Sequence, residues 1–134
     1  AAEAAGGLDW CAGTCVEYAK TRQQFGRIIG SYQAVAHACV ELYGAARSAH
    51  AAARWAAVAA ENGVGEADLA SHVAALRAGE DYRVQTEAGV HLLGGIGFTW
   101  EHDMHLYYRR ARAASTLTGG AGSHRLAVAA LAGL

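Results

Sequence analysis

The chain has 134 residues, and its 11 basic and 12 acidic side chains give a formal net charge of −1, which excludes the strongly basic surface that nucleic acid or an anionic membrane would attract. No apolar run reaches the ~18 residues of a membrane-spanning helix, and the first residues lack the basic and apolar regions of a signal peptide. Because three cysteines, an odd number, fit a reduced compartment better than a disulfide framework, we expect a cytoplasmic protein with no membrane insertion.

The first predicted helix covers residues 1–22 of a chain whose composition favours helix throughout. Proline, which breaks helices, is absent, and alanine, the best helix former, dominates, so we expect an all-α fold. Leu8, Cys11 and Cys15 share one face at the helical period, and buried thiols explain the two cysteines better than a metal site. No capping side chain or initiator methionine precedes the helix at Ala1, so we expect a fragment of a longer protein.

Residues 21–27 interrupt the helical pattern. Gly26 is typical of the position after a helix end, where the helix dipole also favours basic side chains. A charged helix end is therefore one interpretation. The other is a binding site in which the Arg22 guanidinium and the Phe25 ring hold a phosphate and an aromatic ring of one ligand. The residues themselves leave both interpretations open.

The remaining pattern predicts four more helices. Their ranges are 31–62, about 68 to the glycines at 94–97, 103–114 and 123–134, with glycine-rich turns at 63–65 and 119–122. The predicted apolar face of the second helix carries Tyr32, Val35, Cys39, Tyr43, Ala46 and Ala53. Long helices joined by short turns form antiparallel neighbours, so we expect one domain over 1–134, an antiparallel four-helix bundle with one short extra helix. Its many alanines leave a modest core, and we expect the bundle to pack against another domain or subunit.

The segment 92–110 departs most from ordinary helical sequence. Its three closely spaced glycines do not form a dinucleotide-binding fingerprint, since no strand precedes them and their spacing is wrong, but they let a ligand edge or a neighbouring helix approach the backbone. His102 and His105 lie beside two acids, yet without a second ligand pair a hydrogen-bonded helix start explains them better than a metal site. We expect no metal. No serine or cysteine is set against a histidine and an acid for hydrolytic chemistry.

Four motifs occur in order along the chain: Arg-Gln-Gln-Phe-Gly at 22–26, Ser-Tyr-Gln at 31–33, Leu-Gly-Gly-Ile-Gly-Phe-Thr-Trp-Glu-His at 93–102 and Tyr-Tyr-Arg-Arg-Ala at 107–111. Together they resemble the C-terminal helical domain of the flavin-dependent acyl-CoA dehydrogenases over essentially the whole chain. The sequence at 94–102 is especially similar to that of actinobacterial members, some of which assemble from two different subunits. The resemblance implies an FAD-dependent α,β-dehydrogenation of an acyl-CoA thioester, in fatty acid or steroid side-chain oxidation, by the full-length protein.

The resemblance also implies a cofactor site shared between subunits. Six residues match FAD contacts in the family: Arg22, Phe25, Gln33, His91, Gly94 and Gly95. Arg22 and Phe25 match residues on the pyrophosphate and adenine side of an FAD that the adjacent subunit binds for the most part. His91 stands where a glutamine is usual. We therefore expect a homo- or hetero-oligomer, a dimer or a tetramer.

Thr118 occupies the position of the family's catalytic base. In many members a glutamate there removes the α-proton, and a threonine hydroxyl is far too weak a base for that step. Other members place the base on the first helix, at a position a few residues before Ala1. Either the full-length protein has its base there, or this chain is a non-catalytic assembly subunit or a structural bundle without chemistry. In both cases we expect no catalytic residue in this chain and no turnover by it alone.

Overall fold

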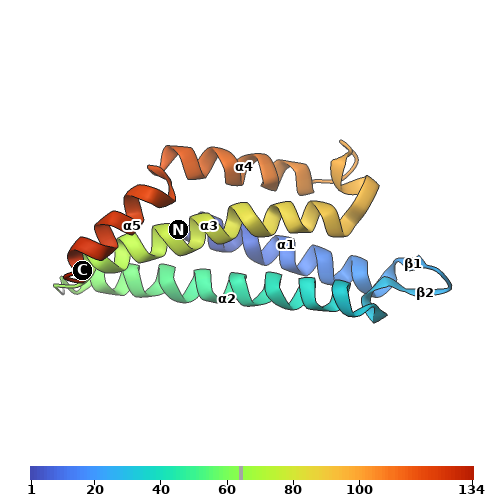
Figure 1. Cartoon of the computed structure of the whole chain (residues 1–134), viewed down its shortest axis with the longest axis horizontal. Helices are drawn as coiled ribbons and strands as arrows, with labels where there is room; N and C mark the ends of the chain where they lie inside the picture. The colour runs from blue at the N-terminus through green and yellow to red at the C-terminus, as the bar shows by residue number, and fades with distance from the viewer. Residues whose placement is uncertain (64) are drawn as a thin grey trace.

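The computed structural model describes residues 1–63 and 65–134, which form a bundle of helices (Figure 1). The three long helices are α1 (Ala2–Thr21), α2 (Gln33–Glu61) and α3 (Ala67–Leu93), and the two shorter ones are α4 (Met104–Leu117) and α5 (Gly120–Leu131). α4 returns along α3, and α5 bends away from the α4 axis towards the other end of α3 (Figure 1). The predicted all-α, antiparallel four-helix bundle is confirmed. No helix in the described part of the chain is both long and apolar enough to span a membrane.

Small side chains let the long helices approach closely. One core cluster is built mainly from alanines around Leu8 and Tyr82, and the second contains Cys11, Cys15 and Met104. A Cβ atom at Gly7 would lie 2.6 Å from the Tyr82 ring, so the contact between α1 and α3 requires a glycine there. Both core cysteines are fully buried, and burial raises the pKa of each thiol to about 12. The prediction of buried thiols is confirmed.

The predicted face of α2 is confirmed at Ala46 and is wrong at Tyr43. Leu42, Ala46 and Ala49 are fully buried, whereas Tyr43 is 59% exposed. The prediction placed the larger side chains inside, but alanines fill the narrow space between α2 and its neighbours and leave the tyrosine outside. The predicted turn after α2 is partly described: Asn62 ends the helix and Gly63 has a φ of 62°, while Val64 lies outside the described residues.

The segment after α1 is a β-hairpin, so the prediction of Gly26 as the residue after a helix end is wrong. α1 ends at Thr21, and Arg22 is already extended. Strands β1 (Gln23–Gln24) and β2 (Arg27–Ile28) pair antiparallel, with Gln24 opposite Arg27. Phe25 and Gly26 form the two-residue turn, with φ of 52° and 79°. Positive φ at both positions is the geometry that matches the right-handed twist of a tight hairpin.

Two short 3₁₀ helices complete the end of the bundle that carries the hairpin. They are η1 (Ile29–Ser31), which leads into α2, and η2 (Gly94–Phe98), which follows α3. The ring nitrogen Nδ1 of His102 accepts a hydrogen bond of 3.0 Å from the backbone N–H of Met104, which confirms a hydrogen-bonded start of α4. The hairpin and η2 therefore lie at one end of the bundle, and the α2–α3 connection lies at the other (Figure 1).

Candidate functional site

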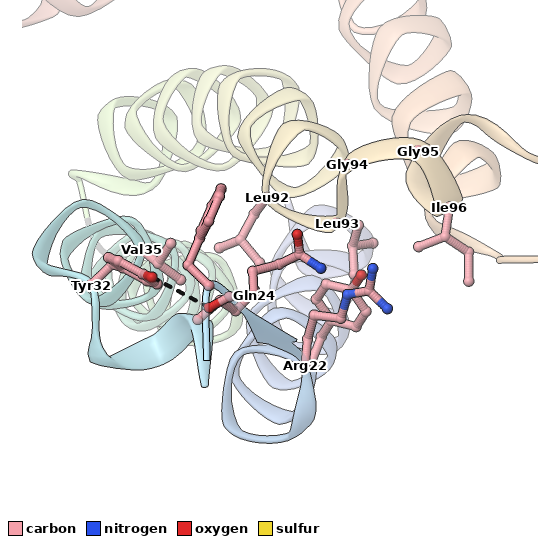
Figure 2. Close-up of a pocket in the computed structure, with 12 residues that line it drawn as sticks. Arg22, Gln24, Tyr32, Val35, Leu92, Leu93, Gly94, Gly95 and Ile96 are labelled. Carbon is pink, nitrogen blue, oxygen red and sulfur yellow. Dashed lines mark hydrogen bonds between the residues drawn. The ribbon is translucent and has the colours of Figure 1, made fainter. Parts of the chain in front are cut away.

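A cavity of about 610 Å³ lies where the hairpin faces the end of α3 (Figure 2). Its wall combines the end of α1, the hairpin, η1, the start of α2 and the α3–η2 corner. The residues that line it are Tyr18, Arg22, Gln24, Phe25, Ile29, Tyr32, Val35, Leu92, Leu93, Gly94, Gly95 and Ile96. The wall is mainly apolar and aromatic, with a few polar groups, which is the usual character of a small-molecule site.

Arg22 supplies the charge of this cavity. Its side chain is exposed, and Figure 2 shows the guanidinium on the side that faces Leu93 and Gly94. No carboxylate belongs to the cavity wall, and within residues 1–63 and 65–134 Arg22 forms no ion pair with an acid. A guanidinium in such a setting attracts an anion and can bind a phosphate through two parallel hydrogen bonds.

Phe25 presents its ring at the tip of the hairpin. The side chain is 91% exposed although it is a large apolar group. Its φ of 52° is left-handed, a conformation that bulky L residues avoid. Strained residues of this kind concentrate at binding sites, so the geometry favours a role for the ring outside the packing of this chain.

Gly94 and Gly95 form the opposite wall, and their small size has two different reasons. Gly94 has a φ of 65°, which requires glycine at the end of α3. A Cβ atom at Gly95 would meet no atom of the chain within 4 Å, whereas one at Gly97 would lie 2.6 Å from the Val90 carbonyl oxygen. Packing within this chain therefore explains Gly97 but not Gly95, and Gly95 leaves room for a group that approaches from outside.

The structure brings together four of the six predicted cofactor residues, Arg22, Phe25, Gly94 and Gly95. The other two do not line the cavity. Gln33 is exposed in the first turn of α2. His91 is exposed in the last turn of α3, and its ring meets the Phe98 ring edge-on, with 6.3 Å between the two ring centres. The cofactor contacts of all six residues stay a prediction.

Sequence reasoning missed several wall residues, of which Tyr18 and Tyr32 are the largest. Tyr18 precedes Arg22 by one helical turn, and this spacing of four residues could have placed the two on one face. Tyr32 belongs to a motif that was noted, but its hydroxyl donates a hydrogen bond of 3.3 Å to the Gln24 carbonyl oxygen only because the hairpin folds back (Figure 2). That contact depends on a turn type that the sequence analysis did not predict.

Thr118 lies at the end of α4, outside the cavity wall. Its hydroxyl donates a hydrogen bond of 3.0 Å to the Ala114 carbonyl oxygen of its own helix. Neither this arrangement nor the chemistry of a hydroxyl makes it a general base. The described residues also contain no group of three or more histidine, cysteine, aspartate or glutamate side chains that could hold a metal ion.

Comparison with known proteins decides the family. The family model described as acyl-CoA dehydrogenase, C-terminal domain, matches residues 1–132. The chain is an acyl-CoA dehydrogenase C-terminal domain. The acyl-CoA dehydrogenase FadE34 of Mycobacterium tuberculosis is 45% identical over 132 residues, which are 98% of this chain and 19% of FadE34.

Two solved structures superpose closely on this acyl-CoA dehydrogenase domain. The steroid ACAD Tcur3481–Tcur3483 has a TM-score of 0.91 and 28% identity, over 97% of this chain and 36% of that one. The FAD complex of PigA has a TM-score of 0.92 at 22% identity, over 98% of this chain and 34% of that one, and this likeness concerns the fold alone. The domain thus spans 19% of the length of FadE34 and about a third of each solved chain.

Proposed function

We propose that this domain contributes one wall of the FAD site of an acyl-CoA dehydrogenase, which removes hydrogen from the α and β carbons of an acyl-CoA thioester. The observation that supports this proposal is the cavity that combines Arg22 and Phe25 with the glycines at 94 and 95. When bound, FAD supplies the redox chemistry by accepting a hydride. The chain itself binds and orients the cofactor.

The cavity residues suit a dinucleotide. Arg22 provides a cation for a phosphate in a wall free of carboxylates, and Phe25 provides a flat ring in the same wall. Gly95 leaves the backbone open to close approach. A cavity of about 610 Å³ that opens at the molecular surface has room for part of such a molecule, so the rest of the cofactor would lie against an adjacent subunit.

We also propose that this domain contributes to the assembly of subunits. Large apolar side chains are exposed in the described structure, and among them are Phe98, Trp100, Leu117, Leu126 and Leu134. Exposed apolar side chains of this size would lose their contact with water if another domain or subunit covered them, which supports a role in assembly. We therefore propose a homo- or hetero-oligomer, a dimer or a tetramer, in which another part of the protein supplies the catalytic base. The 28% identity with a steroid ACAD supports a steroid-bearing acyl-CoA as one substrate class, beside fatty acyl-CoA.

The test uses the full-length protein, co-expressed with its partner subunit if it has one. We expect a yellow protein whose flavin absorbance bleaches when an acyl-CoA substrate is added. Arg22→Ala should lose most of its FAD, because one phosphate then lacks its cation, while Arg54→Ala, an exposed arginine in the far half of α2, should keep it. A colourless wild-type protein would overturn the proposal.

The alternative is a module that only assembles, and the replacement of the usual base by Thr118 is the observation that favours it. The same Arg22→Ala variant separates the two functions. Full retention of flavin in the variant, with an intact oligomer, would support the assembly module and count against a cofactor role of this cavity.

A further inference from the structure

We propose that Tyr32 is a positioning residue, which holds the hairpin turn so that Phe25 keeps its left-handed conformation beside the cavity. This inference rests on the proposed cofactor role of Arg22 and Phe25. Tyr32 itself is assigned no contact with the cofactor. Its effect on binding is exerted through the conformation of Phe25.

Tyr32 contacts the residues on both sides of the turn. Its hydroxyl donates to the carbonyl oxygen of Gln24, the residue before Phe25, at 3.3 Å (Figure 2). The guanidinium carbon of Arg27, the residue after Gly26, lies 3.9 Å from the centre of the Tyr32 ring, a cation–π distance. A single side chain thus joins the last residue of β1 to the first residue of β2.

The turn needs such support because little else in its own structure favours it. Each strand has two residues, and a hairpin this short is at best marginal in water. Phe25 is 91% exposed, so burial within the chain does not fix the position of its ring. A phenylalanine at a φ of 52° also opposes the turn, since L side chains disfavour that region. The contacts of Tyr32 offset this local preference.

Tyr32 is well placed for this task because its own backbone is anchored. It is the N-cap residue of the 29-residue helix α2, and the neighbouring η1 is attached to the base of the hairpin by a bond of 2.8 Å from the Ile29 N–H to the Arg22 carbonyl oxygen. A Cβ atom at Gly30 would lie 2.8 Å from the Ala19 carbonyl oxygen, so η1 also packs tightly on α1. These contacts hold the base of the hairpin in place, and the contacts of Tyr32 with Gln24 and Arg27 hold its turn.

The test measures the affinity of the full-length apoprotein for FAD by titration of flavin fluorescence. Tyr32→Phe removes the hydrogen bond and keeps the ring, and we expect FAD affinity to fall about three- to tenfold, as for the loss of one hydrogen bond. Tyr32→Leu also removes the contact with Arg27 and should weaken binding further. The matched control is Tyr43→Phe on the same helix, where the Arg47 guanidinium lies 5.4 Å from the ring, and its affinity should change less than about twofold.

A double-mutant cycle separates positioning from a general structural role. If Tyr32 acts through Phe25, then Tyr32→Phe should have almost no further effect on FAD affinity in a Phe25→Gly background. Equal effects of Tyr32→Phe in both backgrounds would overturn the proposal. Melting temperatures of the apoproteins should agree between Tyr32→Phe and Tyr43→Phe.

The outcomes also distinguish this inference from the function on which it rests. If Arg22→Ala keeps its FAD, the proposed function itself fails. If Arg22→Ala loses FAD while Tyr32→Phe and Tyr32→Leu bind it as tightly as the wild type, the cofactor role of the cavity stands and the positioning role of Tyr32 is overturned.

Discussion

Phe25 has two properties that are unfavourable for a residue that makes contacts only within its own chain. Its ring is exposed to solvent, and its backbone is left-handed. Left-handed φ costs an L residue roughly 1–2 kcal/mol, whereas glycine adopts it without that cost. The residue therefore lowers the stability of its own domain, and a binding role outside the domain would account for its presence.

We predict that Phe25→Gly leaves the domain as stable or raises its free energy of unfolding by up to about 1 kcal/mol, while FAD retention falls. Relief of strain exceeds the greater chain entropy that glycine brings to the unfolded state, about 0.4–1 kcal/mol. Phe98→Gly is the matched control, because Phe98 is 69% exposed and has a negative φ, so it should only destabilise. Denaturant unfolding and flavin absorbance measure both effects. A clear loss of stability in Phe25→Gly would contradict the strain argument.

At the scale of elements, two of the three glycines of η2 are small for different reasons. Gly97 packs against the backbone of α3, and Gly95 faces open space at the cavity. In the sequence alone, the three glycines of this segment form one feature. The sequence could predict a close approach at this corner, but which glycine serves packing and which serves access depends on the path of the backbone.

We predict that Gly95→Ala folds normally and binds FAD more weakly, whereas Gly97→Ala destabilises the domain by about 1–3 kcal/mol, as expected for overpacking. The added methyl at residue 95 enters the cavity, and the one at residue 97 would lie 2.6 Å from a carbonyl oxygen. Thermal unfolding and FAD titration of the two variants make the comparison. Equal melting temperatures for both variants would refute it.

The helix α5 buries no residue completely and depends on polar contacts with its neighbours. The Nδ1 atoms of His72 on α3 and His124 on α5 are 2.9 Å apart, and Nε2 of His124 lies 2.8 Å from the Thr118 carbonyl oxygen. Since a carbonyl only accepts, Nε2 of His124 carries the proton in its contact with Thr118. One imidazole thus connects α5 both to α3 and to the end of α4.

We predict that His124→Ala lowers the free energy for opening α5 by about 1–2 kcal/mol, because it removes the contacts of one imidazole with His72 and with the Thr118 carbonyl oxygen. Hydrogen exchange of the amides in 120–131 should accelerate, and exchange in α1 should not change. His37→Ala, an exposed histidine on α2, is the control. Unchanged protection of α5 would mean that its apolar contacts suffice.

For the molecule as a whole, antiparallel packing brings Arg22, Phe25 and the glycines at 94 and 95 to one cavity. Helix periods and glycine turns were enough to predict the all-α bundle and the element order. The hairpin was missed because a phenylalanine in a left-handed turn contradicts ordinary turn preferences. On α2, Tyr43 was wrongly placed in the core because the size of a side chain does not decide burial in an alanine-rich bundle. The wall residues Tyr18 and Tyr32 needed the assembled helices.

We predict that Leu126→Glu lowers the mass of the assembled full-length protein without changing its helix content. Leu126 is 75% exposed, so a charge costs little in the domain but much in an apolar contact between subunits. Ser48→Glu, an exposed polar position on α2, should leave the assembly intact. Analytical ultracentrifugation and circular dichroism provide the two measurements. An unchanged mass would place the subunit contact elsewhere.

The α2–α3 connection lies at the end of the bundle opposite the hairpin (Figure 1), and hairpin residues line the cavity. Length changes there do not alter the register of α1, α2 and α3 at the cavity, whereas one residue added within α3 would turn the Gly94–Gly95 wall by ~100° about the helix axis. We therefore expect the protein to tolerate insertions in the α2–α3 connection and to lose the cavity wall when a residue is inserted within α3. A fluorescent reporter or an affinity peptide inserted between Glu61 and Ala67 would leave the binding end intact, and gene duplicates could diverge in length there first.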